Sequence, residues 1–176
     1  MSGSLHVWYG LRDLETLGKR QVTLDGEFPL RKLTRLAELL HDPDGDAVGS
    51  VEASLRFEQR GDGWLGLTLD YDTTVELTCQ RCLEPFRERI SDRVAMVIAE
   101  SEPPPSVVPE GFELVELDDG RLLPAQLIED ELIVSIPLVP KHARVEDCGS
   151  LARALTTSTP KPDAIRRPEP RSDDKQ

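Results

Sequence analysis

The amino-acid sequence predicts an α+β fold, in which an antiparallel sheet, built as a meander with a cysteine-bearing loop, packs against one or two amphipathic helices. Apolar residues occupy the odd positions of 64–79 and the even positions of 86–98. This alternation is typical of strands with one buried face. Residues 30–40 carry apolar side chains at three- and four-residue intervals, which indicates a helix that can cover such a face.

The N-terminal part of the chain is expected to hold a short strand and a helix. Residues 1–20 show only a short apolar stripe at helical spacing, formed by Trp8, Leu11, Leu14 and Leu17. Alternation in 21–28 predicts a short strand. Pro29 suits the first position of a helix. The predicted helix therefore runs from Pro29 to Leu40, and proline and glycine residues end it soon after.

Three strands then form the predicted meander. The first covers 51–57, and Gly61-Asp62-Gly63 turns the chain into the second strand, which ends at Cys79. The third strand is the later of the two alternating runs. A two-residue turn between the second and third strands would require positive φ at Gln80 and Arg81, so we expect a wider loop or a knuckle there.

The C-terminal half begins with a proline-rich loop at 102–109, which neither a helix nor a strand can continue through. A short strand is expected at 112–117. Apolar residues then recur every four positions, which predicts a helix over about 124–135. Residues 132–134 also fit a buried strand.

A length of 176 residues suits one domain with a tail. We expect a single α+β domain over residues 1–154 and a disordered tail over 155–176, where apolar residues almost disappear. No apolar run approaches the roughly 20 residues that span a bilayer, and the N-terminus lacks the regions of a signal peptide. We therefore expect a cytoplasmic protein that binds no membrane.

The net charge of −12 argues against a broad basic surface for nucleic acid. Ten carboxylates lie between Glu100 and Glu131, against one cation, Arg121. Such a band serves ordinary solubility or attracts a basic partner. The carboxylates that we consider candidates for partner binding are Glu113, Glu116, Asp118 and Asp119.

Two groups of cations are candidates for contact with phosphates. The first lies on the polar face of the predicted N-terminal helix and consists of Arg31, Lys32 and Arg35. The second consists of Arg81, Arg87, Arg89 and Arg93, of which the last three project from one face of the third strand. For this second group we favour pairing with carboxylates of the preceding strand, namely Asp70, Asp72 and Glu76.

Three cysteines and one histidine form a candidate metal site. Cys79 and Cys82 lie two residues apart in the loop, and His142 and Cys148 complete a Cys₃His set that suits tetrahedral zinc. The alternative is reduced thiols that pack as small hydrophobic groups. Redox chemistry is disfavoured because no helix follows the cysteine pair. Glu129, Asp130 and Glu131 could also bind a metal, although we expect an acidic, solvated helix face.

Two separated motifs form a recognisable pattern. The first is the stretch from Leu77 to Phe86, and the second runs from Leu127 to His142 and on to Cys148. The pattern covers Cys79, Cys82, Glu129, Asp130, Glu131, Pro137, Pro140, His142 and Cys148. It resembles the YceD family of large ribosomal RNA subunit accumulation proteins. The resemblance implies a non-enzymatic factor needed for synthesis, processing or stability of 23S rRNA, with no catalytic residue to assign.

We therefore expect a ribosome-biogenesis factor that binds a large-subunit rRNA precursor or a large-subunit ribosomal protein. No small-molecule substrate and no cofactor other than a structural zinc is expected. One alternative is an acidic chaperone or adaptor for a basic ribosomal protein. The other is an RNA-processing enzyme, but a nuclease would need metal-binding carboxylates inside a basic groove.

Overall fold

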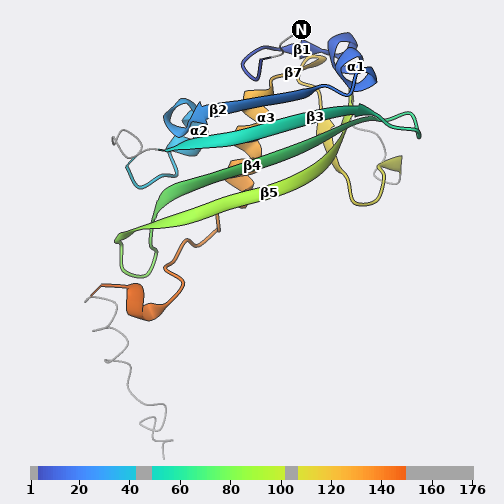
Figure 1. Ribbon diagram of the computed structural model, residues 1–176. Helices are drawn as coiled ribbons and strands as arrows, with labels where there is room; N and C mark the ends of the chain where they lie inside the picture. The colour runs from blue at the N-terminus through green and yellow to red at the C-terminus, as the bar shows by residue number, and fades with distance from the viewer. Residues whose placement is uncertain (1–3, 43–48, 102–106, 150–176) are drawn as a thin grey trace, which may run out of the picture.

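The computed structural model describes residues 4–42, 49–101 and 107–149 (Figure 1). The end of the predicted domain at 154 and the predicted disordered tail at 155–176 lie outside these residues. The described part contains a five-stranded sheet of order β2-β3-β4-β5-β6. Its strands are β2 (Thr23–Pro29), β3 (Ser50–Gln59), β4 (Leu65–Thr78), β5 (Pro85–Ala99) and β6 (Glu113–Glu116).

The predicted meander is confirmed, and the sheet extends it on both edges. β3, β4 and β5 pair in antiparallel order, and the short strand β2 joins them as an antiparallel edge. At the other edge β6 runs parallel to β5, with Glu113 opposite Met96. The alternation of the sequence predicted these strands because each has one buried face. It could not show that β6 returns to the sheet in parallel.

The helix predicted over 124–135 is confirmed as α3 (Pro124–Ser135), so residues 132–134 are not a strand. The N-terminal stripe forms α1 (Leu11–Lys19), although Trp8 precedes the helix and is exposed. Two further short strands, β1 (Tyr9–Gly10) and β7 (Arg121–Leu122), pair with each other. Figure 1 shows α3 lying behind the sheet, so that one face of the sheet is covered.

The continuous helix predicted from Pro29 to Leu40 is wrong. Pro29 is the last residue of β2, and the chain then forms the 3₁₀ turn η1 (Leu30–Lys32) and the short helix α2 (Thr34–Ala37). Leu33 breaks the helix with φ −89° and ψ 86°. The predicted apolar stripe is nevertheless buried, because Leu30, Leu33, Leu36 and Leu40 all lie in the core.

A distant carboxylate explains where α2 begins. Oε1 of Glu129 accepts hydrogen bonds from the backbone N–H groups of Arg35 (2.8 Å) and Leu36 (3.2 Å). The first N–H groups of a helix have no partner within the helix. Glu129, on α3, supplies that partner and so fixes the start of α2.

Candidate metal centre

The loop between β4 and β5, Cys79 to Glu84, is wider than a two-residue turn, as the sequence predicted, and is called the knuckle here. The N–H of Cys79 donates to the carbonyl oxygen of Glu84 (3.0 Å), and the N–H of Leu83 donates to that of Cys79 (2.8 Å). Positive φ falls on Leu83, at 63°, and not on Gln80 or Arg81. Left-handed backbone is costly for a residue with a side chain, and Leu83 is also 72% exposed. The turn therefore holds Leu83 in a conformation that glycine would adopt more easily.

The second half of the centre follows α3. The N–H of Gln80 donates to the carbonyl oxygen of Pro140 (2.8 Å), which ties the knuckle to the segment 137–149. A 3₁₀ turn, η3 (Val145–Asp147), ends where the N–H of Cys148 donates to the carbonyl oxygen of Val145 (3.1 Å). These contacts bring His142 and Cys148 to the knuckle.

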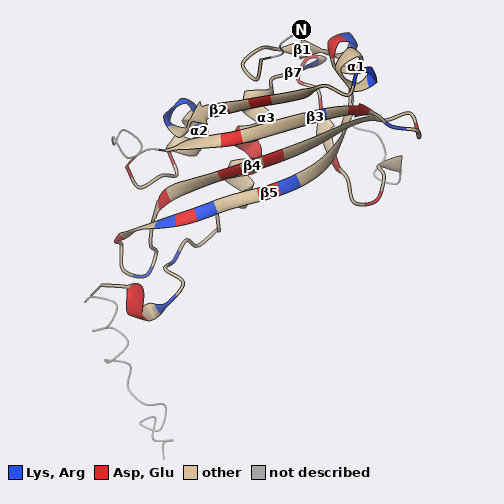
Figure 2. Cartoon of the chain, in the orientation of Figure 1, with Lys and Arg blue, Asp and Glu red and all other residues tan. Residues whose placement is uncertain are grey.

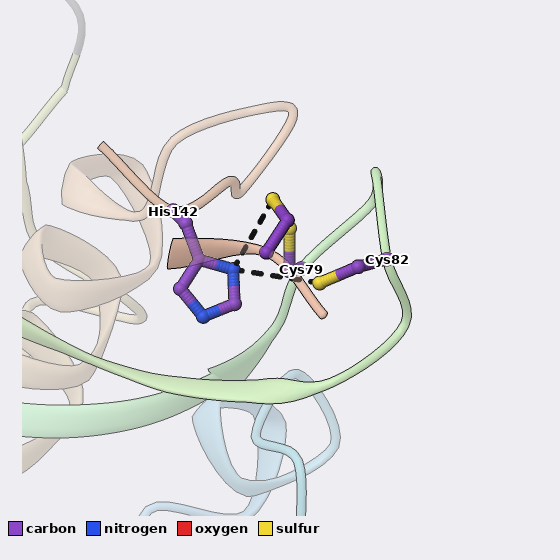
Figure 3. Close-up of side chains that lie close together, drawn as sticks. Cys79, Cys82 and His142 are labelled. Atoms are coloured by element: carbon purple, nitrogen blue, oxygen red, sulfur yellow. Dashed lines mark hydrogen bonds between the residues drawn. The ribbon is translucent and has the colours of Figure 1, made fainter. Parts of the chain in front are cut away.

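The four predicted ligands converge. The ligand atoms of Cys79, Cys82, His142 and Cys148 all lie within 4.8 Å of one another. Figure 3 shows the ring of His142 directed at the thiols of the knuckle. Nδ1 of His142 lies 3.5 Å from Sγ of Cys82 and 3.7 Å from Sγ of Cys148.

These distances test the fit to zinc. Zn–S bonds of about 2.3 Å and Zn–N bonds of about 2.0–2.1 Å in a tetrahedron place sulfur and nitrogen about 3.6 Å apart. Both measured separations from Nδ1 agree with that value. The three thiols are buried, and thiolate sulfur with imidazole nitrogen is the donor set that zinc prefers. The Cys₃His cluster is thus compatible with a zinc ion.

The electrostatics favour a thiolate at Cys79. Burial opposes its ionisation, but hydrogen bonds from the backbone N–H groups of His142, Arg81 and Cys82 outweigh burial and lower its pKa from 9.0 to about 5. The N–H of Arg81 lies 3.4 Å from Sγ of Cys79. At Cys148 burial raises the pKa of the thiol, and the neighbouring thiols of Cys82 and Cys79 raise it further.

Arg81 contacts the candidate metal centre, whereas the sequence indicated it only as a candidate for contact with phosphates. Besides its backbone contact with Cys79, its guanidinium Nη1 donates to Sγ of Cys148 (3.6 Å). One residue therefore contacts a thiol from each half of the centre. Three thiolates and one neutral imidazole around Zn²⁺ leave a net negative charge, which the guanidinium of Arg81 would offset. Its position between Cys79 and Cys82 in the sequence could have indicated that it lies beside the candidate metal centre.

The comparisons with known proteins agree with the two motifs. The family profile described as "Large ribosomal RNA subunit accumulation protein YceD" matches residues 67–170, more than half of the chain. The chain belongs to the YceD family. A relative of that name from Haemophilus influenzae is 26% identical over 153 residues, which cover 86% of this chain and 85% of the relative. No solved structure matches the chain.

The YceD family is thus named for the accumulation of large-subunit ribosomal RNA, not for a reaction. The matched residues contain the knuckle, α3 and all four candidate ligands. In the part of the chain that the structure describes, no helix is long and apolar enough to cross a membrane.

The candidate acidic residues of this YceD chain lie on β6 and on the turn that follows it. Glu113, Glu116, Asp118 and Asp119 are all exposed. Asp118 and Arg121 exchange backbone hydrogen bonds of 2.9 and 3.0 Å, which close the turn. Asp118-Asp119-Gly120 therefore lies in a closed turn whose carboxylates face solvent.

Some of the candidate cations form ion pairs with carboxylates within the described residues, and others do not. Nε of Arg89 donates to Asp72 (3.1 Å), and Arg93 pairs with Asp70, so the favoured cross-strand pairing is confirmed at both positions. Arg31 and Lys32 are exposed. Arg35 instead forms ion pairs with Glu129 (2.9 Å) and Asp130 (2.6 Å). Arg35 is consequently less available to a phosphate than its neighbours.

The expectation that Glu129 belongs to a solvated acidic face is wrong. Glu129 is only 7% exposed and accepts hydrogen bonds from the backbone at the start of α2 and from the guanidinium of Arg35. A buried carboxylate requires such partners. Both oxygens of Glu129 serve to join α2 to α3.

Proposed function

We propose that the protein is a non-enzymatic ribosome-biogenesis factor that supports the synthesis, processing or stability of 23S rRNA through binding. We propose in addition that Cys79, Cys82, His142 and Cys148 hold a structural zinc ion. The observation that carries this proposal is the convergence of four ligand atoms within 4.8 Å, all drawn from the span that matches the YceD family. The role would place the protein in the cytoplasm, where ribosomes assemble.

The geometry of the centre favours binding over catalysis. Catalytic zinc keeps one position open for water or substrate, whereas a set of four protein ligands fills the tetrahedron. Zinc in this site would supply structure, by joining the β4–β5 loop to the segment 137–149. The carboxylate of Glu129 is already occupied by α2 and Arg35, which argues against a metal-dependent nuclease built on α3.

Two kinds of partner fit this role. A large-subunit rRNA precursor could be contacted through Arg31 and Lys32, which are exposed, although Arg35 is held in ion pairs. A basic large-subunit ribosomal protein is the second kind, and it is favoured by the exposed carboxylates Glu113, Glu116, Asp118 and Asp119. In that case the protein acts as an acidic chaperone or adaptor.

Depletion and rescue in cells test the proposed function. Cells that lack the protein should contain less 23S rRNA relative to 16S rRNA, and expression of the wild type should restore the ratio. Residues 1–154 alone should also restore it, since we propose that they form the domain. The variants Cys82→Ser and Cys148→Ser should restore it less well. A ratio that does not respond to the wild type would refute the proposed function.

A further inference from the structure

The face of the sheet opposite α3 is open to solvent and hollowed. Figure 1 shows this face toward the viewer, with none of the described elements in front of it. A cavity of about 910 Å³ lies over the middle of β2, β3, β4 and β5. Antiparallel sheets commonly leave one face in water, but here that face is concave.

The cavity is strongly acidic. Figure 2 shows red segments on β2, β3 and β4, and both blue and red segments on β5. One arginine, Arg93, lines the cavity, together with five carboxylate side chains that project from this face: Asp25, Glu27, Glu52, Asp70 and Asp72. The acidic band that the sequence indicated between Glu100 and Glu131 includes none of these residues.

The register of the strands places like charges directly opposite each other. Glu27 of β2 lies opposite Glu52 of β3, and Glu52 in turn lies opposite Asp72 of β4. Opposed like charges on neighbouring strands destabilise a sheet. The row formed by Glu27, Glu52 and Asp72 therefore lowers the stability of the sheet. A surface that served only solubility would avoid this cost, because cations would be interspersed among the carboxylates.

Ion pairs neutralise the carboxylates on the β4 side of this face, but not those on the β2 and β3 side. Asp70 and Asp72 pair with Arg93 and Arg89 of β5. On the other side, no cation within the described residues pairs with Asp25, Glu27 or Glu52. Arg56 of β3 lies further along the strand, opposite Thr23 and Thr68. The carboxylates of β2 and β3 thus remain available to a cationic partner.

We infer that this hollow face of the sheet docks an extended, lysine- and arginine-rich segment of a partner protein. Charge complementarity identifies the occupant, because the face would repel the phosphates of RNA. The inference deepens the proposed function and rests on it, since it selects a basic protein as the partner that this surface binds. On this inference the surface that binds the basic partner consists of the carboxylates of β2 and β3, and not of the turn at Asp118.

A binding measurement with purified protein tests the surface. The probe is a fluorescein-labelled peptide of alternating lysine and serine, and the control peptide carries glutamate in place of lysine. The wild type should bind only the lysine peptide, with an affinity that falls as salt rises. The double variant Glu27→Lys, Glu52→Lys should bind it at least about tenfold more weakly, because two attractive charges become repulsive.

A matched variant separates this face from the rest of the acidic surface. Asp42→Lys, Glu110→Lys reverses two exposed carboxylates that do not line the cavity, and should bind the peptide as the wild type does. Glu52→Lys by itself should raise the melting temperature, since the new cation then lies between Glu27 and Asp72 and opposite charges become adjacent. If Glu52→Lys binds the lysine peptide more weakly although it is more stable than the wild type, the result would support a docking surface.

Three outcomes overturn the inference: no binding by the wild type, equal loss in the Asp42 and Glu110 variant, or unchanged binding by the Glu27 and Glu52 variant. Rescue of depleted cells distinguishes a failure of the proposed function from a failure of the proposed docking surface. If the wild type fails to restore 23S rRNA, the proposed function fails, whatever the peptide shows. If the Glu27 and Glu52 variant restores 23S rRNA fully while its peptide binding is lost, the surface has no part in that function.

Discussion

Nδ1 of His142 lies 3.5 Å from Sγ of Cys82, although 60 residues separate the two in the chain. The knuckle supplies one partner, and the segment after α3 supplies the other. The hydrogen bond from Gln80 to Pro140 holds the same two segments together beside the centre. The fold thus brings the ligands together through contacts that do not themselves require metal.

Protein purified without chelator should contain about one zinc ion per chain, because the centre offers four ligand atoms within 4.8 Å of one another. Elemental analysis measures the content. Cys82→Ser and Cys148→Ser should each lose most of the metal and lower the melting temperature. Glu84→Gln is the control: it changes a neighbouring side chain that is not a ligand, and this variant should keep its zinc. Wild-type protein without zinc, or full retention in both serine variants, would contradict the site.

The metal-free protein should gain stability as pH rises from about 5 to 9, and this gain should depend on Cys79. The pKa of this thiol is about 5 in the fold against an ordinary 9.0, so between these values the unfolded chain binds more protons than the folded one. The free energy of unfolding then rises with pH, and the contribution of Cys79 is lost as pH falls through about 5.

Urea unfolding of chelator-treated protein at several pH values measures this slope. Cys79→Ser should flatten it, and the thiolate absorbance that titrates near pH 5 should disappear with it. The same slope in wild type and variant would mean that another group titrates.

Glu129→Ala should lower the free energy of unfolding by about 1–3 kcal/mol, because the N–H groups of Arg35 and Leu36 lose their acceptor. Asp130→Ala is the control. Asp130 pairs with the same arginine, but its side chain is 46% exposed, and exposed ion pairs contribute at most about 1 kcal/mol. Chemical denaturation compares the two variants. Equal losses would show that Glu129 acts as a surface ion pair and not as the cap of α2.

Leu83→Gly should raise the free energy of unfolding by up to about 1.5 kcal/mol. Left-handed backbone costs a residue with a side chain about 1–2 kcal/mol, and the greater freedom of glycine in the unfolded chain offsets about 0.5–1 kcal/mol of the gain. Leu83→Ala keeps the φ of 63° strained and should give no such gain. If denaturation shows the two variants to be equal, strain at Leu83 does not explain the effect.

The sequence alone determined several local elements of this protein. Period-two alternation identified β3, β4 and β5, and four-residue spacing identified α3 at its observed bounds. The two motifs also contained the four residues that converge at the candidate metal centre. These features are local, since each depends on residues within a single strand, helix or loop.

The tertiary structure decided what depends on residues far apart in the chain. The helix expected from Pro29 to Leu40 breaks at Leu33, and a carboxylate on α3 restarts it at Thr34. Strand register alone sets Glu27, Glu52 and Asp72 in one row. Neither result is visible in a window of sequence, because hydrogen-bond partners and cross-strand neighbours are chosen when the whole chain packs.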